Sequence, residues 1–188
     1  MWGAGQFGDY DHLDQAAWAA IVELGYQLPG WFAKPWLRGG VNIASGDHDP
    51  GDDEHGTFFN MLPTNHIYYG FADQLAFQNL TNPFVQLRVS PFEILALNFF
   101  VHWFQLTEAD DARYGGTGAY DKHVFGFTAA GTGGRTRVGT EYDLVATLTP
   151  HRTTTVELGY SHLDGGPMYK TSPNRDLDFF YASLELKY

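Results

Sequence analysis

The chain ends in Asp176–Tyr188, with the sequence DLDFFYASLELKY, in which apolar and polar side chains alternate. One side of this stretch carries the apolar residues Phe180, Ala182, Leu184 and Leu186, and the other side carries Ser183, Glu185 and Lys187. Successive side chains of a β-strand point to opposite faces of a sheet. The stretch therefore predicts a closing strand with one apolar face and one polar face, ending in an aromatic residue.

The same alternation recurs along most of the chain. It is found in His12–Leu28, Trp31–Ser45, Pro83–Ser90, Glu93–Thr107, Thr136–Thr149 and Thr153–Leu163. Strands of soluble proteins are usually about 5–6 residues long, whereas a tilted strand that spans a bilayer needs about 9–11. The long segments favour an all-β fold, a transmembrane antiparallel up-and-down β-barrel. We expect seven strands, with Trp2–Phe7 as a candidate eighth.

The connections between these segments also alternate, in length. Short ones contain proline, as at Pro29-Gly30 and Pro150-His151-Arg152, and the long ones are Gly46–Asn82, Glu108–Arg135 and Asp164–Arg175. Short turns on one side and long loops on the other are typical of outer-membrane barrels. If the C-terminus is periplasmic, all three long connections lie outside. His66–Phe77 is then an inserted loop or short helix; the competing interpretation makes it a strand after a long periplasmic connection.

The inward face of the predicted strands carries many small residues, namely Ala17, Ala19, Gly25, Gly40 and Gly139. The interior of a closed eight-stranded barrel is filled by side chains, and small residues do not fill it. We therefore expect residues 1–188 to form a single outer-membrane β-barrel domain that is the C-terminal part of a longer, wider barrel.

Composition excludes several classes of protein. The chain has 188 residues, no cysteine, and 22 acidic against 11 basic residues, so it lacks the basic footprint that nucleic-acid binding needs. The chain contains no run of 18 or more apolar residues, so no membrane-spanning helix is predicted. We expect a location in the bacterial outer membrane, with outer-membrane lipid, lipopolysaccharide and the barrel-assembly machinery as partners. The two acidic clusters, Asp47–Glu54 and Glu108–Asp111, are interpreted as solvated loops.

The candidate functional residues are charged side chains on the inward face. The predicted pore-lining set is Arg38, Arg88, Arg137, Glu141, Asp143, Glu157 and Lys187. The guanidinium fork of arginine suits carboxylate groups; alternatively, each arginine pairs with an acid on a neighbouring strand. In the long loop, His66, Tyr69 and Asp73 are candidates for constricting the pore.

Other kinds of site have weaker signals. Asp47, Asp49 and Asp52 could bind Ca²⁺, which prefers carboxylate oxygens, although their spacing is not that of an EF-hand; no other cofactor is expected. Ser161, His162 and Asp164 are too close in sequence to form a triad, because strand neighbours point to opposite faces. No GxSxG motif is present, and we do not expect an enzyme.

Several stretches, in order, resemble one known family. They are Ala44–Pro50 followed by Asp52-Asp53, Leu62–His66, Tyr69–Asp73, Glu108–Ala112, Gly139–Leu144 and Glu157–His162. Together they resemble the bacterial alginate-export family of outer-membrane barrels, whose members are longer and whose C-terminal portion this chain matches.

The resemblance implies a channel or related porin that passes an anionic polysaccharide or small solutes by passive diffusion. The alternative is a non-transporting structural or adhesion barrel with acidic, ion-binding loops. A pore for a polyanion should be basic, whereas the inward charges here are mixed.

Overall fold

The computed structural model describes residues 1–61, 66, 68–116, 128–169 and 176–187. Strands dominate it. They are β1 (Trp2–Tyr10), β2 (Leu13–Gln27), β3 (Trp36–Ala44), β4 (Glu54–His55), β5 (Leu80–Phe92), β6 (Leu95–Gln105), β7 (Arg113–Gly115), β8 (Thr128–Ala130), β9 (Arg137–His151), β10 (Thr154–Gly165) and β11 (Leu177–Leu186), with a 3₁₀ turn, η2, at Pro167–Tyr169. Within the described ranges, no helix is long and apolar enough to cross a membrane.

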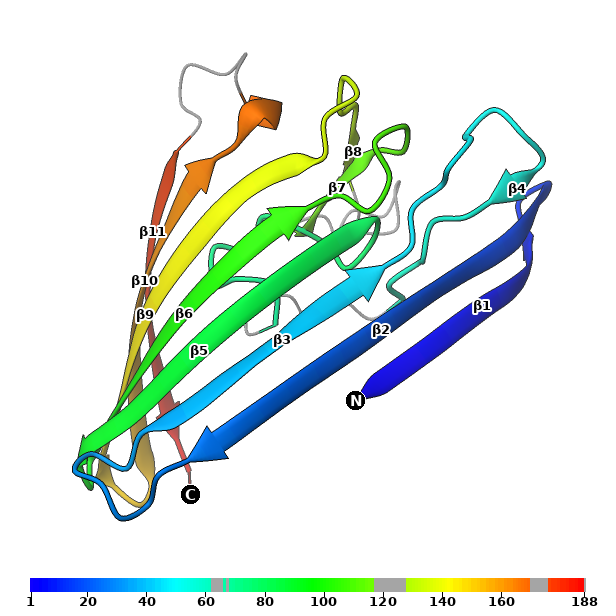
Figure 1. Cartoon of the computed structure of the whole chain (residues 1–188). Helices are drawn as coiled ribbons and strands as arrows, with labels where there is room; N and C mark the ends of the chain where they lie inside the picture. The colour runs from blue at the N-terminus through cyan, green and yellow to red at the C-terminus, as the bar shows by residue number, and fades with distance from the viewer. Residues whose placement is uncertain (62–65, 67, 117–127, 170–175, 188) are drawn as a thin grey trace.

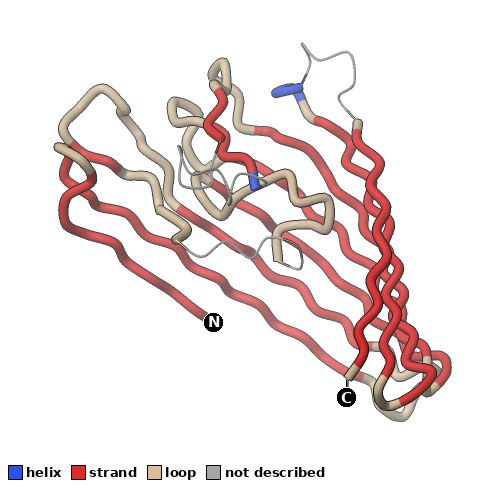
Figure 2. The backbone as a smooth tube through the Cα atoms, turned by 180° about the vertical axis from the view of Figure 1, so that it is seen from behind, coloured by secondary structure: helices blue, strands red, loops and turns tan. Residues whose placement is uncertain are grey.

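The long strands form one antiparallel meander in the order β1-β2-β3-β5-β6-β9-β10-β11. Each strand pairs with the next along the chain, and β1 and β11 are the two edges of a curved, trough-shaped sheet (Figures 1 and 2). The predicted seven strands are confirmed, and so is the candidate eighth at the N-terminus. Alternation succeeded as a guide because the seven predicted strands carry large apolar side chains at alternate positions, on their convex face.

The connections separate by length as predicted. The turns after β2, β5 and β9 gather at one end of the sheet, and the long connections lie at the other end (Figure 1). Three short strands in the long connections had no sequence signal: β4 adds in parallel to the start of β2, and β7 pairs with β8. These pairings involve only two or three residues, which is too short for alternation to register.

The convex face of the sheet is apolar and exposed. Leu24 is 83% exposed and Phe180 is 73% exposed, although both lie in the middle of strands. Large side chains of the same strand parity continue this surface, namely Trp18, Val22, Tyr26, Leu37, Val85, Leu87, Phe99, Trp103, Tyr142, Leu144, Leu158, Leu184 and Leu186. So large a continuous apolar surface is far beyond what soluble monomers expose, and it is typical of the lipid-facing side of a membrane barrel.

The connection between β3 and β5 folds back over the concave face (Figure 2). Its residues Phe58, Leu75 and Phe77 are buried in a core with Ala17 and Ala19 of β2. The described residues of His66–Phe77 include no strand, so the inserted-loop interpretation is confirmed and the spanning-strand interpretation is wrong. Small inward side chains suit a wall that faces solvent, but those of β2 lie under this loop.

A β-bulge at the start of β9 reverses one prediction. Phe104 of β6 pairs with Gly139, but the next residue, Gln105, pairs with Arg137, so Val138 is an extra residue on β9. A bulge shifts the facing of the residues on one side of it. Val138 is therefore buried in the concave core. Arg137 is exposed on the convex face beside Gln105, and its predicted place in the lumen is wrong.

Candidate functional site

A row of buried polar side chains crosses the concave face of five strands, and we call it the polar belt. Its members are Asn42 on β3, Asn82 and Gln86 on β5, His102 on β6, Glu141 and Asp143 on β9, and Ser161 on β10. The strand register places them in cross-strand pairs, Asn42 with Asn82, His102 with Glu141, and Asp143 with Ser161. Cross-strand partners share one face of a sheet, so the belt is continuous.

The belt is connected internally by contacts around His102. Its Nδ1 lies 3.2 Å from Asn82 Nδ2 and 3.3 Å from Asn82 Oδ1, and its Nε2 lies 3.8 Å from Asp143 Oδ2. The ring stacks against Phe84, Phe100 and Phe104, with centroids 5.5–5.8 Å apart. Aromatic side chains therefore hold the imidazole in place between the polar groups of β5 and β9.

The inserted loop rests directly on Glu141. The backbone N–H of Ala72 donates to Glu141 Oε1 at 2.9 Å, and both residues are buried. Gly70 has a left-handed φ of 85°, and a Cβ at this position would lie 2.6 Å from the carboxylate carbon of Glu141. Only glycine combines this backbone angle with so close an approach. Gly70 and Ala72 thus seat the loop on the carboxylate.

Aromatic rings fix the loop on either side of this seat. Phe71 packs on Phe100 and lies parallel to the ring of Tyr181 on β11, with centroids 5.5 and 6.0 Å away. Tyr181 donates its hydroxyl to Glu157 at 2.8 Å. His66 packs edge-on against both Phe71 and Tyr181, and its Nδ1 lies 2.7 Å from Asp73 Oδ2.

The three predicted constriction residues therefore have different surroundings. His66 and Asp73 pair with each other and stay about one-third exposed. Tyr69 is buried and stacks on Phe77 at 4.7 Å, and this burial raises the pKa of its hydroxyl. Tyr69 thus belongs to the core under the loop, and its side chain does not project into open space.

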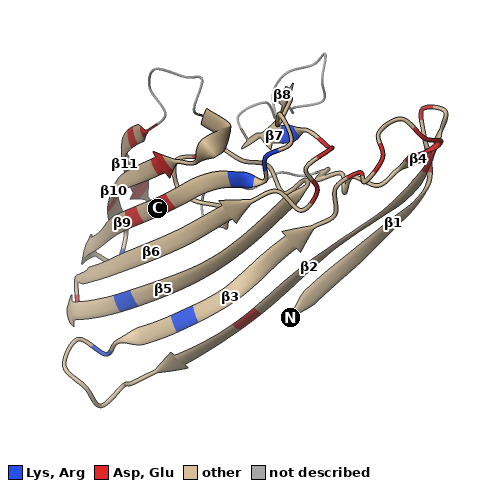
Figure 3. Ribbon diagram, turned by 45° about the horizontal axis from the view of Figure 1, so that its top comes forward, with Lys and Arg blue, Asp and Glu red and all other residues tan. Residues whose placement is uncertain are grey.

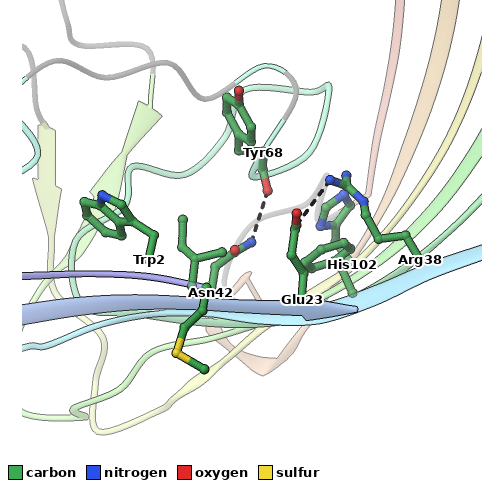
Figure 4. A pocket seen from close by; sticks show the side chains of 9 residues that line it. Trp2, Glu23, Arg38, Asn42, Tyr68 and His102 are labelled. Atoms are coloured by element: carbon green, nitrogen blue, oxygen red, sulfur yellow. Dashed lines mark hydrogen bonds and ion pairs between the residues drawn. The ribbon is translucent and has the colours of Figure 1, made fainter. Parts of the chain in front are cut away.

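A cavity of about 230 Å³ lies beside the loop and is lined by residues of β1, β2, β3, β5 and β6 (Figure 4). Arg38 lines it and bonds Glu23 through Nη1 at 3.2 Å, and its guanidinium lies 5.4 and 5.2 Å from the rings of Trp36 and Phe84. On the other side, Asn42 Nδ2 donates to the carbonyl of Tyr68 at 3.3 Å. Arg38 is therefore held by a carboxylate and two rings, as the pairing alternative predicted.

The remaining predicted wall residues face the trough with different exposures. Arg88 is exposed near the short turns, and among the described residues no carboxylate lies within ion-pair distance of it. Glu157 is half-buried and accepts from Thr147 Oγ1 at 3.3 Å as well as from Tyr181. Lys187 and Glu185 form an exposed pair at 3.6 Å. The basic bands on β3 and β5 and the acidic residues near β4 are visible in Figure 3.

The acidic loop residues Asp47, Asp49 and Asp52 bind backbone groups. Each accepts from the N–H two residues later, at 3.1, 3.2 and 2.8 Å respectively. In the part of the chain that the structure describes, no group of three or more acidic, His or Cys side chains is placed to hold a metal ion. The geometry thus does not bring these three carboxylates together around one point.

The interpretation of both acidic clusters as solvated loops is partly wrong, because Asp47 and Asp111 are buried. Asp111 accepts from Thr57 Oγ1 at 2.6 Å, from Tyr114 Oη at 2.9 Å and from the backbone N–H of Asp47 at 3.0 Å. Burial and the nearby Asp111 charge raise the pKa of Tyr114. Asp111 therefore joins the β3–β5 and β6–β9 connections.

Gly70 and Asp111 were not predicted as structural centres. The one available signal was the family resemblance at Tyr69–Asp73 and Glu108–Ala112, which contain them. Composition and alternation could not identify them, because their partners lie far along the chain.

Comparison with known proteins agrees with the resemblance noted in the sequence. A family model described as alginate export matches residues 1–183, nearly the whole chain. A search of curated proteins found no match.

Proposed function

Because the chain belongs to the alginate export family, which consists of outer-membrane β-barrel export channels and not of enzymes, we propose that its concave face lines a pore. The proposed function is the passive movement of an anionic, alginate-like polysaccharide or of small solutes through this pore. The observation that carries the proposal is the two-faced sheet: its convex side is apolar and exposed, and its concave side holds the polar belt and a folded-in loop.

The loop would narrow this pore. Residues 66 and 68–79 lie on the concave face, with Ala72 bonded to Glu141 on β9 and the Tyr68 carbonyl bonded to Asn42 on β3. A segment bonded to strands on both sides of the trough reduces the cross-section open to a solute. We propose that His66 and Asp73, which keep part of their surface exposed, face the remaining opening.

Arg88 is the best-placed contact for a passing carboxylate. It is exposed on the concave face, whereas Arg38 is already bonded to Glu23. A guanidinium forms two-point hydrogen bonds with a carboxylate.

Outer-membrane lipid and lipopolysaccharide are proposed as partners of the apolar convex face. The barrel-assembly machinery is proposed as a partner of the folding chain.

Conductance in planar bilayers tests the channel. Folded protein should give discrete conductance steps, and oligouronates should reduce the current while neutral oligosaccharides of equal size should not. We expect Arg88→Gln to weaken the oligouronate block severalfold. Arg137→Gln is the matched control, because Arg137 lies on the convex face and its replacement should leave the block unchanged.

Two outcomes would count against parts of this proposal. Folded, membrane-inserted protein that gives no conductance would favour the structural or adhesion barrel with acidic loops. Conductance that neither polymer blocks would favour small solutes over a polysaccharide.

A further inference from the structure

We propose that Glu141 is the positioning residue that anchors the inserted loop on β9, and that the loop backbone comes this close to it only because residue 70 is glycine. Only the effect of this anchor on conductance rests on the proposed pore function. How the loop is held on the wall can be tested without any transport measurement.

Glu141 is fully buried on the concave face of β9, where a carboxyl group is costly unless it is hydrogen-bonded. Its bond from the Ala72 N–H at 2.9 Å comes from a residue 69 positions away. Without the loop, this buried acceptor would lose the donor that the Ala72 backbone supplies.

The loop backbone at Gly70 fits closely against the carboxyl group of Glu141. The φ of 85° at Gly70 and the absence of a Cβ allow the loop backbone to lie against the carboxylate, whose Oε2 would be only 2.8 Å from any added Cβ. No other described residue of the inserted loop approaches the β9 wall with its backbone in this way at a positive-φ glycine. The loop is therefore shaped for this particular side chain.

This part of the loop also packs against apolar side chains of the wall. Phe71 packs in a small cluster with Phe100 and Val145, and the partly buried Tyr181 packs against this cluster. Apolar packing is non-directional, so it would hold the loop near the wall without fixing its register. Directional contacts are made on both sides, from Asn42 Nδ2 to the Tyr68 carbonyl on the β3 side and from the Ala72 N–H to Glu141 on the β9 side. Loss of the Glu141 bond should let the β9 side of the loop leave the trough more often.

The test uses a cysteine reporter, because the chain has no native cysteine. Ala76 lies in the loop and is 1% exposed, and its backbone N–H donates to the carbonyl of Tyr114. In the full chain folded in lipid, an Ala76→Cys reporter should react with a maleimide about tenfold faster or more when combined with Glu141→Ala. Glu141→Gln keeps an acceptor oxygen and should restore most of the protection. Gly70→Ala should accelerate labelling as well.

The matched control is Glu23→Ala, which removes an inward carboxylate that bonds Arg38. It should leave the labelling rate within about twofold of the reporter alone. In a double-mutant cycle, Gly70→Ala should be less damaging on the Glu141→Ala background, because the added methyl group then has no carboxylate to meet.

Unchanged labelling in both Glu141→Ala and Gly70→Ala would overturn the anchor, even if the protein conducts. Faster labelling in a protein that conducts no current would support the anchor and remove the proposed pore. If both proposals hold, Glu141→Ala should raise the frequency of large conductance steps, and Glu141→Gln should return it toward the wild-type frequency.

Discussion

Replacing Asn79 with alanine should separate the two long connections at the loop end of the sheet. Asn79 is fully buried. Its Nδ2 donates to the carbonyls of Glu108 and Ala112, both at 3.0 Å, and its Oδ1 accepts from the Glu108 N–H at 2.7 Å. Its φ of 46° lies in the left-handed region, which asparagine tolerates better than alanine does.

The size of the effect follows from these contacts. Each lost hydrogen bond contributes about 0.5–1.5 kcal/mol net, and alanine adds about 1 kcal/mol of backbone strain in the left-handed region. We expect Asn79→Ala to destabilise the loop junction by about 3–5 kcal/mol in total. Asn79→Gly is the matched control, because it loses the same hydrogen bonds without the strain and should cost about 1 kcal/mol less.

Amide hydrogen exchange of the folded protein in lipid is the appropriate measurement, because the junction can open without unfolding of the sheet. The amide of Glu108 should lose protection by about two orders of magnitude or more, since about 1.4 kcal/mol corresponds to a factor of ten. A change of less than about threefold at that amide would refute the reasoning. It would mean that the backbone bonds of Asn79 to Ser45 and Thr107 hold the junction alone.

Three further predictions concern single positions. Gly159→Ala should lower the free energy of unfolding in urea by about 1–3 kcal/mol, because a Cβ there would run into the tyrosine ring facing it on β11. Ala19→Phe should have a similar cost by overfilling the core under the loop, and an unchanged urea midpoint would argue against a packed loop. The pKa of His48 is raised, chiefly because Glu108 accepts its hydrogen bond. The His48–Glu108 pair therefore stabilises the folded loop at pH values below the ordinary histidine pKa, and this contribution is lost as the pH rises through the raised pKa of His48. Glu108→Gln should lower the midpoint of the His48 titration measured by NMR.

The sequence was a good guide to the strands and a poor guide to the loops. A period of two located seven of the long strands, and the edge strand Trp2–Tyr10 was expected only as a candidate eighth at Trp2–Phe7. The parity of the strands also favoured an inserted loop over a spanning strand at His66–Phe77, and the structure confirms the loop. Both inferences need only local pattern and the rule that long loops share one end of the barrel.

The errors came from places where one residue departs from the local pattern. Alternation was extended through Thr136–Thr149 without interruption, but the bulge at Val138 reverses the facing of Arg137. Nothing in the composition of that segment marks the extra residue. Similarly, Asp47 and Asp111 have the composition of solvated loop residues, and only contacts between distant connections explain why they are buried.

The two halves of the concave face explain why this loop folds inward. On β2 and β3, the small side chains Ala17, Ala19 and Ala44 leave room for Phe58 and Phe77, so burial of apolar surface holds one side of the loop. On β9, Glu141 offers a hydrogen-bond acceptor that the loop backbone satisfies at Ala72. An open trough lined only by small residues would leave apolar surface exposed, and a buried carboxylate without a donor would be costly. Each feature is unfavourable without the loop and favourable with it, so the wall and the loop have to be read as one unit.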